Sequence, residues 1–173
     1  MFLVSSAVSP RPVDAVVMIG VLSTWYDDGH AVPMEPLIAI VDDDEAVGNA
    51  LQRMLKSHGF TVEVFASAEQ FLRGPDLQSA SCLILDVRMP GMTGLALHEH
   101  LTGTGCRIPT ILITACPTRS ERRRAIASGV ASYLAKPVSE EVLLDTIREA
   151  LEDGRQAEGE AGSTGPTRTE DLI

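Results

Sequence analysis

Short apolar runs alternate with segments of helical periodicity from residue 37 to residue 152. The run at 83–85 follows Cys82 without polar alternation and stops at Asp86, as expected for a strand buried on both faces of a parallel sheet. Residues 60–65 alternate and contain β-branched side chains, which also favours a strand. The complete set of predicted strands is 37–41, 60–65, 83–85, 109–114 and 132–135.

The segments between these strands carry helix start and stop signals. Thr93 is placed as an N-cap, and the pairs Ser67/Gln70 and Thr118/Glu121 have capping-box spacing. The predicted helices cover 46–55, 67–72, 94–101, 118–129 and 139–152. Five βα units with right-handed crossovers build a doubly wound parallel sheet with helices on both faces, so we expect an α/β fold.

Periodicity also predicts the domain organisation. Residues 1–33 lack a packed amphipathic pattern, so we expect a disordered or mis-annotated extension, with Met34 as an alternative start of translation. The folded domain is predicted to span 34–153. Residues 154–173 contain Gly, Ser, Thr, Pro and charged side chains with few core-forming residues, which predicts a flexible tail.

Composition narrows the class of protein. The 173-residue chain is 45% hydrophobic but has no apolar run long enough to span a bilayer, so no membrane association is expected. Its net charge of -10 argues against direct, sequence-independent nucleic-acid binding, which needs surplus Lys and Arg. Its three cysteines form no disulfide or metal-binding pattern, which suits a cytoplasmic protein.

Charged and polar side chains follow four of the predicted strands. They are expected at one edge of the sheet, where the carboxyl ends of parallel strands meet and ligands collect. Carboxylates this close repel one another unless a cation lies among them, and oxygen ligands favour Mg²⁺. Together with a hydroxyl and an ammonium they could hold a phosphoryl group while one carboxylate attacks phosphorus. The residues are Asp42, Asp43, Asp86, Thr114 and Lys136.

Four segments of this edge resemble the receiver domain of bacterial two-component response regulators: 41–45, 85–94, 113–115 and 133–137. The amino-acid sequence around Asp86 and at 67–72 is most similar to that of the nitrogen-fixation regulator branch of the family. The resemblance implies a flavodoxin-like fold with strand order 2-1-3-4-5. Members of that branch usually carry an output domain, and none is visible after the last predicted helix, so a stand-alone receiver is expected.

The resemblance implies a role for each site residue. Asp86 would be the phosphoacceptor and, with Asp43, a direct Mg²⁺ ligand. Asp42 would act through water, and the backbone carbonyl of Arg88 would complete the metal shell. Thr114 and Lys136 would receive the phosphoryl oxygens. Tyr133 matches the aromatic position whose rotamer changes with that of Thr114 in the family; the alternative is a half-buried tyrosine with a solvated hydroxyl. The resemblance also implies a cis peptide bond before Pro137.

The implied function is a switch. A sensor histidine kinase or histidine phosphotransfer protein would supply the phosphoryl group, and the receiver would alter its binding to an unknown downstream protein or dimerise, without turning over a separate substrate. The fourth helix, last strand and last helix are the expected contact face. Its basic character comes from Arg122, Arg123 and Arg124, for which a solvated face and an acidic neighbour are both open.

Two other functions stay in view. A phosphatase of the haloacid-dehalogenase type also uses a strand-end aspartate with Mg²⁺, but it needs a second acid two residues later, where this chain has Arg88. A receiver fold can also act as a phosphorylation-independent binding module. Val138 and the Cys116-Pro117 pair differ from the residues that are commonest at these positions in the family. In the family arrangement Arg88 and Cys116 would flank the phosphoacceptor Asp86.

Overall fold

The computed structural model describes residues 35–74 and 79–161, with side chains through residue 155. Helices and strands alternate strictly along this part of the chain. The strands are β1 (Leu37–Val41), β2 (Thr61–Phe65), β3 (Ala80–Asp86), β4 (Thr110–Thr114) and β5 (Ser132–Ala135). The helices are α1 (Glu45–Ser57), α2 (Ala68–Leu72), α3 (Gly94–Gly103), α4 (Arg119–Ala127) and α5 (Glu140–Ala161).

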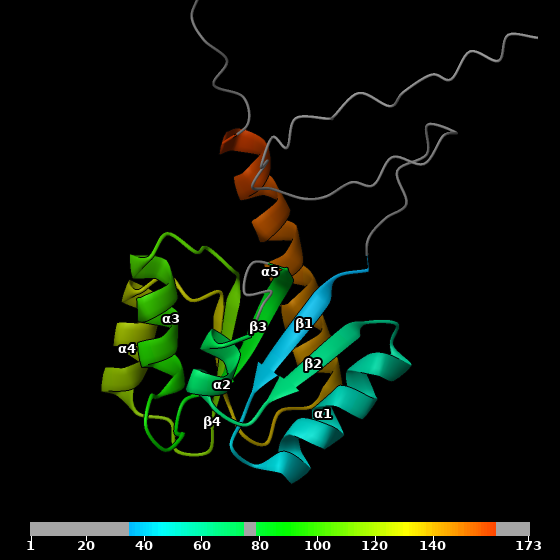
Figure 1. The fold of residues 1–173 in the computed structure, drawn as a ribbon, viewed down its shortest axis with the longest axis vertical. Helices are drawn as coiled ribbons and strands as arrows, with labels where there is room; N and C mark the ends of the chain where they lie inside the picture. Colours follow the sequence, from blue (N-terminus) through cyan, green and yellow to red (C-terminus); the bar gives the residue numbers. More distant parts are fainter. Residues whose placement is uncertain (1–34, 75–78, 162–173) are drawn as a thin grey trace, which may run out of the picture. The chain divides into compact units, whose positions relative to one another are not determined.

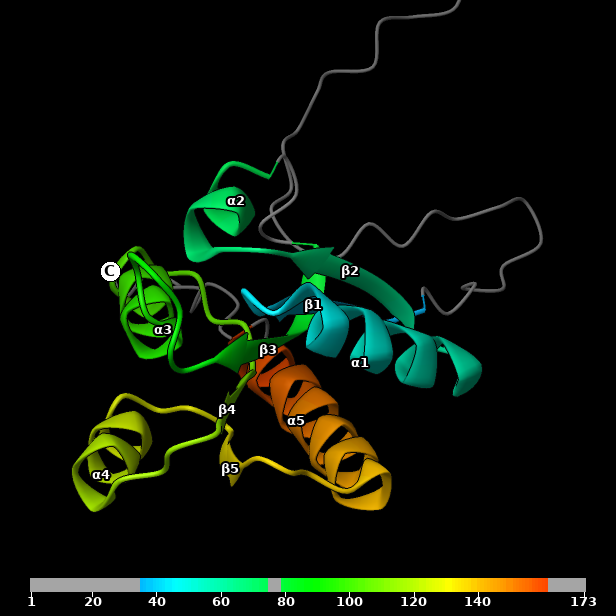
Figure 2. The same ribbon diagram turned by 90° about the horizontal axis from the view of Figure 1, so that it is seen from below.

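The five strands form one parallel sheet in the order β2-β1-β3-β4-β5 (Figure 1). This confirms the predicted doubly wound α/β fold and its strand order. In the view from below, α1 and α5 lie on one side of the sheet while α3 and α4 lie on the other (Figure 2). The strand order reverses between β1 and β3, because β2 is added on one side of β1 and the later strands on the other, and ligand sites form at such a point in open sheets.

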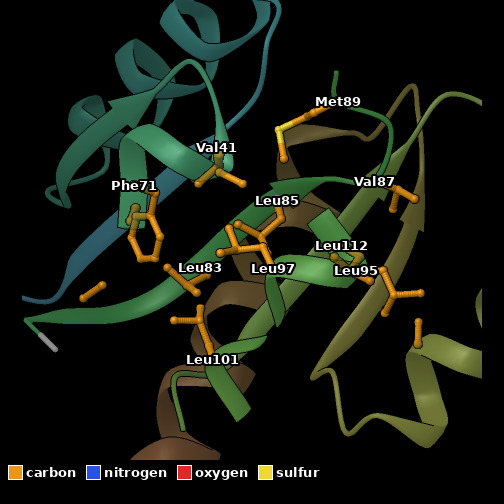
Figure 3. Packing of buried hydrophobic residues seen from close by; sticks show 14 residues of the cluster. Val41, Phe71, Leu83, Leu85, Val87, Met89, Leu95, Leu97, Leu101 and Leu112 are labelled. Atoms are coloured by element: carbon orange, nitrogen blue, oxygen red, sulfur yellow. The ribbon is translucent and has the colours of Figure 1, made fainter. Parts of the chain in front are cut away.

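Each face of the sheet buries its own apolar cluster. On the α1 and α5 side, Ile38, Ile84 and Ile111 of the strands pack with Leu55 and Ile147 of the helices. The other face packs strand residues against α2, α3 and α4; Figure 3 shows Phe71, Leu97 and Leu101 gathered around Leu83, Leu85 and Leu112. Because the central strand is covered on both faces, its unbroken apolar run is explained.

Side-chain caps fix where the helices begin. Ser67, Thr93 and Thr118 each accept a hydrogen bond from a backbone N–H in the first turn of α2, α3 and α4, as their spacing predicts. Asp44 does the same for α1, because its carboxylate accepts from Ala46 and Val47. Asp44 is therefore a structural cap within the acidic run and is not available as a further site carboxylate.

The last helix is longer than its apolar pattern predicts. It continues to Ala161, nine residues beyond the predicted end at Glu152, so residues 154–161 of the predicted tail are helical. Gly154 lies against the core domain, since a Cβ there would be 2.8 Å from Cγ of Pro109. Residues 1–34, 75–78 and 162–173 lie outside the described residues, which leaves the predicted extension and the end of the predicted tail as predictions. No helix in the described ranges is long and apolar enough to cross a membrane.

Candidate functional site

The sheet register brings the strand-end residues to a common level. Val41 of β1 pairs with Leu85 of β3, so Asp42 and Asp86, the next residues, follow neighbouring strands at the same height. Asp86 pairs with Ile113, one residue before Thr114. Thr114 in turn pairs with Ala135, one residue before Lys136. The carboxyl edge of the sheet thus assembles these four side chains, as the sequence predicts.

Lys136 joins the two buried carboxylates. Its Nζ lies 2.6 Å from Oδ1 of Asp86 and 2.9 Å from Oδ2 of Asp42. Asp42 and Asp86 are buried, with 4% and 7% of their surface exposed, and this one ammonium offsets part of their combined negative charge. Burial of Lys136 lowers its pKa, but hydrogen bonds and Coulombic attraction from Asp86 and Asp42 outweigh burial and raise it overall.

The backbone at Lys136 has two special features. Its peptide bond to Pro137 is cis, as the family resemblance implies. Its N–H also donates to the backbone oxygen of Thr114 at 2.7 Å, which fixes the end of β5 to the end of β4. The hydroxyl oxygen of Thr114 is fully buried beside them and accepts from the N–H of Cys116 at 3.3 Å.

Tyr133 presents a buried, unpaired hydroxyl. Its ring packs against the α2, α3 and α4 side of the core. Within the described part of the chain, the oxygen of this hydroxyl has no hydrogen-bond partner. The residue is half-buried, as the alternative expected, but its hydroxyl is buried and not solvated. A buried donor without a partner raises the free energy of the folded state, so a partner gained in another state would be stabilising.

Asp43 differs from its buried neighbour Asp42 in its exposure. It is exposed and lines a groove of about 690 Å³ that also includes Val87, Arg88 and Glu121. Among the residues that the structure describes, no group of three or more carboxylate, imidazole or thiolate side chains is arranged as a metal site. The donor set nevertheless fits Mg²⁺ chemically, because it offers only hard oxygens: the carboxylates of Asp42, Asp43 and Asp86 and a backbone carbonyl at Arg88.

The loop after Asp86 is held by contacts from both sides. The N–H of Arg88 donates to Oδ2 of Asp86 at 2.6 Å, so both oxygens of this carboxylate have partners. From α2, Oε1 of Glu69 accepts from the N–H of Met92 at 3.2 Å. Hydrogen bonds from its own backbone, then from Ser67 and then from Met92 lower the pKa of Glu69. Glu69 was not among the residues predicted to shape the site, since nothing in its spacing points to a loop 23 positions away.

Three polar contacts attach α4 to α3 and to the loop after β3. None of these pairings could be predicted from the sequence. Arg88 meets Glu121 with 3.4 Å between Nη2 and Oε1. Arg124 makes a bidentate pair with Glu99 of α3, at 2.7 and 2.6 Å, and this bonding raises the pKa of Arg124. His98 bonds the backbone oxygen of Ser128 at 3.0 Å. Arg124 thus has the acidic neighbour that was one of its two interpretations, whereas Arg119, Arg122 and Arg123 are exposed.

The comparisons with known proteins agree with this geometry. The family model described as the response regulator receiver domain matches residues 38–148. The response regulator TodT of Pseudomonas putida is 41% identical over 122 residues, which cover 70% of this chain and 54% of TodT. TmoT of Ectopseudomonas mendocina is 42% identical, with 70% of this chain and 56% of TmoT covered. The chain spans about half the length of these curated relatives, so its action without an output domain stays a prediction.

Solved structures show the same likeness. The response regulator StyR is 38% identical with a TM-score of 0.68, over 73% of this chain and 64% of that one. FixJ-N is 33% identical with a TM-score of 0.63, over 68% of this chain and 94% of that one. These matches decide against the haloacid-dehalogenase alternative. Receivers are signalling switches that interact with histidine kinases or phosphotransfer proteins, and they typically use Mg²⁺ at the phosphorylation site. This chain belongs to the response regulator receiver domain family of two-component systems.

Proposed function

We propose that Asp86 accepts a phosphoryl group from the phosphohistidine of a sensor kinase or histidine phosphotransfer protein. The observation that carries this proposal is the contact of 2.6 Å between Oδ1 of Asp86 and the ammonium of Lys136 at the sheet edge. One carboxylate oxygen forms the new bond to phosphorus as the bond between phosphorus and the donor imidazole nitrogen breaks. The electron pair of the broken bond stays on that nitrogen, so atoms and electrons balance.

The remaining site residues have separate tasks in this proposal. Asp42, Asp43, Asp86 and the carbonyl of Arg88 would hold Mg²⁺, which supplies neutralisation of the phosphoryl charge when it is bound. Lys136 turns its ammonium from the carboxylate to a phosphoryl oxygen. Thr114 turns its hydroxyl to another. Both side chains reach the phosphoryl group from the positions that the register gives them.

The magnitudes account for most of a full switch. An attached phosphoryl group adds about 1.5 to 2 negative charges. Each charge-assisted hydrogen bond contributes roughly 1.5 to 3 kcal/mol, so Thr114 and Lys136 together supply about 3 to 6 kcal/mol. Shifting a two-state domain from 1:99 to 99:1 needs about 5.5 kcal/mol. When Thr114 moves toward the phosphoryl group, Tyr133 can follow and find a partner for its buried hydroxyl.

Mass spectrometry of the protein treated with a small acyl phosphate tests this function. We expect one phosphoryl adduct on the wild type, its loss in Asp86→Asn, and its loss on addition of a chelator. Asp43→Asn should also abolish the magnesium dependence, whereas Thr114→Ala should be labelled but respond more weakly in conformation. Equal labelling of wild type and Asp86→Asn would refute the assignment. Absence of labelling by acyl phosphate and by phosphohistidine donors would favour the phosphorylation-independent module.

The proposal extends to partners and place of action. The switch phosphorylates and dephosphorylates itself, acts in the cytoplasm, and binds a downstream protein or a second copy of itself through α4, β5 and α5. On that face Arg122 and Arg123 are exposed beside Ile126, which is 61% exposed. A partner with an acidic patch suits these charges. If charge reversal at Arg122 and Arg123 left partner affinity and its salt dependence unchanged, this face would be wrong.

A further inference from the structure

Helix α4 is weakly packed for an element of this domain. Ala125 is its one buried residue among those described from Arg119 to Ala127. Its neighbour Ile126 points its apolar side chain largely to solvent. Since apolar burial is what usually holds a helix to a sheet, the position of α4 depends to an unusual degree on its polar contacts.

Those contacts divide the helix into two parts. The middle and the end of α4 are fixed to α3, through Arg124 with Glu99 and through Ser128 with His98. The first turn is attached elsewhere, because Glu121 pairs with Arg88 of the loop after β3. Glu121 also accepts from the hydroxyl of the N-cap residue Thr118 at 2.9 Å, so the cap and the ion pair share one carboxylate.

Arg88 touches the acceptor and α4 at once. Its backbone N–H donates to Oδ2 of Asp86, while its guanidinium reaches Oε1 of Glu121. Both side chains of the ion pair are partly exposed, 54% for Arg88 and 30% for Glu121, and they make a single contact of 3.4 Å. That distance exceeds the 2.7 to 2.9 Å typical of charge-assisted hydrogen bonds, which indicates a weak pair that a stronger anion can replace.

We propose that Arg88 is a positioning residue that exchanges one anion for another. In the unmodified protein its guanidinium binds Glu121 and holds the first turn of α4. When Asp86 carries a phosphoryl group, the guanidinium binds a phosphoryl oxygen and releases Glu121. This inference rests on the proposed phosphorylation of Asp86 and adds a route by which α4 responds to it.

Charge and geometry both favour the exchange. The phosphoryl group concentrates about 1.5 to 2 negative charges on oxygens that a guanidinium can contact in pairs, whereas Glu121 offers one charge and one contact. The backbone N–H of Arg88 already contacts Oδ2 of Asp86, so a rotation of the Arg88 side chain is the movement that the exchange requires. The contacts of Glu99 and His98 are untouched, so only the first turn of α4 is released.

Binding of trifluoroberyllate with Mg²⁺, as a stand-in for the phosphoryl group, measures the exchange on the full chain. Glu121→Gln removes the competing anion and should tighten binding about 1.4- to 5-fold, the equivalent of an exposed ion pair. Arg88→Ala should weaken binding. In the Arg88→Ala background, Glu121→Gln should change nothing, whereas a general effect of removing a negative charge would persist there. Asp145→Asn, which removes the exposed pair with Arg148 on α5, is the matched control.

Amide exchange supplies the second readout. The N–H groups of Glu121 and Arg122 bond to Thr118 and report on the first turn of α4. They should exchange faster in the trifluoroberyllate complex of the wild type, and already fast without it in Glu121→Gln and Arg88→Ala. Additive effects in the double variant, or unchanged exchange of these amides, would overturn the anion exchange alone. A wild type that binds no trifluoroberyllate and takes no phosphoryl group would overturn the proposed function with it.

Discussion

At the scale of single residues, the acceptor loop depends on one glycine. Gly94 begins α3, and a Cβ at this position would lie 2.2 Å from the backbone oxygen of Asp86 and 3.0 Å from Cβ of Leu85. A backbone oxygen cannot rotate away as a flexible side chain can. Any larger residue must therefore displace either the start of α3 or the end of β3, where the phosphoacceptor is held.

We expect Gly94→Ala to lower the free energy of unfolding by about 3 kcal/mol, the upper end of the usual cost of overpacking. Gly103→Ala is the matched control in the same helix. A Cβ at Gly103 meets nothing within 4 Å, so alanine should stabilise the protein by about 0.5 to 1 kcal/mol through its better helix propensity. Urea titration measures both changes. Equal effects of Gly94→Ala and Gly103→Ala, or no effect of Gly94→Ala, would contradict the close approach of position 94 to the backbone oxygen of Asp86.

Lys136 predicts how stability depends on pH. Asp86 and Asp42 raise its pKa above the ordinary 10.5, so the folded protein binds this proton more tightly than the unfolded chain. The resulting stabilisation is complete at pH values below 10.5 and is lost as the pH rises through the higher pKa of the folded state. We expect the advantage of wild type over Lys136→Gln, from urea titrations at pH 8 to 12, to stay level and then fall at the alkaline end. A difference that grew with pH would mean that the ammonium is not paired with these carboxylates.

At the scale of elements, α2 acts on the site through a single side chain. Glu69 accepts from the N–H of Met92, and it also lies over Gly91, where a Cβ would be 2.9 Å from its Oε1. Gly91 has a φ of +75°, which a glycine adopts without strain. This short five-residue helix thereby holds the turn in the loop between β3 and α3.

Removal of this acceptor should loosen the loop without unfolding the domain. We expect Glu69→Ala to speed hydrogen exchange at the amide of Met92, since that N–H loses its partner. Glu63→Ala, at an exposed position of β2, is the control and should leave Met92 unchanged. Exchange at Met92 measured by NMR that is equal in both variants would show that the loop is fixed by other contacts.

The elements could be predicted more fully than the pairs between them. Apolar runs and caps place all five strands and five helices, because burial and first-turn hydrogen bonding act locally. The predicted end of α5 at Glu152 was wrong, since residues 154–161 continue the helix without an apolar stripe. The strand-end cluster follows from parallel topology. The pairing of Lys136 with Asp42 and Asp86 follows with it. The partners of Arg88 and Arg124 do not follow, because each exposed cation has several carboxylates on neighbouring elements within reach.

At the scale of the whole molecule, the sheet separates two apolar clusters, and the site lies at one edge of it. Val87, Met89 and Leu95 of the cluster under α2, α3 and α4 also line the groove at Asp43. Val138, which follows the Lys136-Pro137 pair, packs against the cluster under α1 and α5. The site at the carboxyl edge therefore adjoins the apolar clusters on both faces of the sheet.

The extent of the folding unit is the last prediction. The final buried side chain described in α5 is Leu151, and beyond Asp153 the described packing is Gly154 against Pro109. A chain of residues 34–153 should therefore fold with a free energy of unfolding within about 1 kcal/mol of the full chain, as for a surface change. A chain of residues 34–145 is the control. This shorter chain lacks the buried residues Ile147, Ala150 and Leu151. Removing a large buried side chain such as Ile147 or Leu151 costs about 2 to 5 kcal/mol. The combined loss is comparable with the whole free energy of unfolding of a domain, so the chain of residues 34–145 should not fold. If 34–153 melted as poorly as 34–145, the helical residues 154–161 or the segments outside 34–153 would be part of the folding unit.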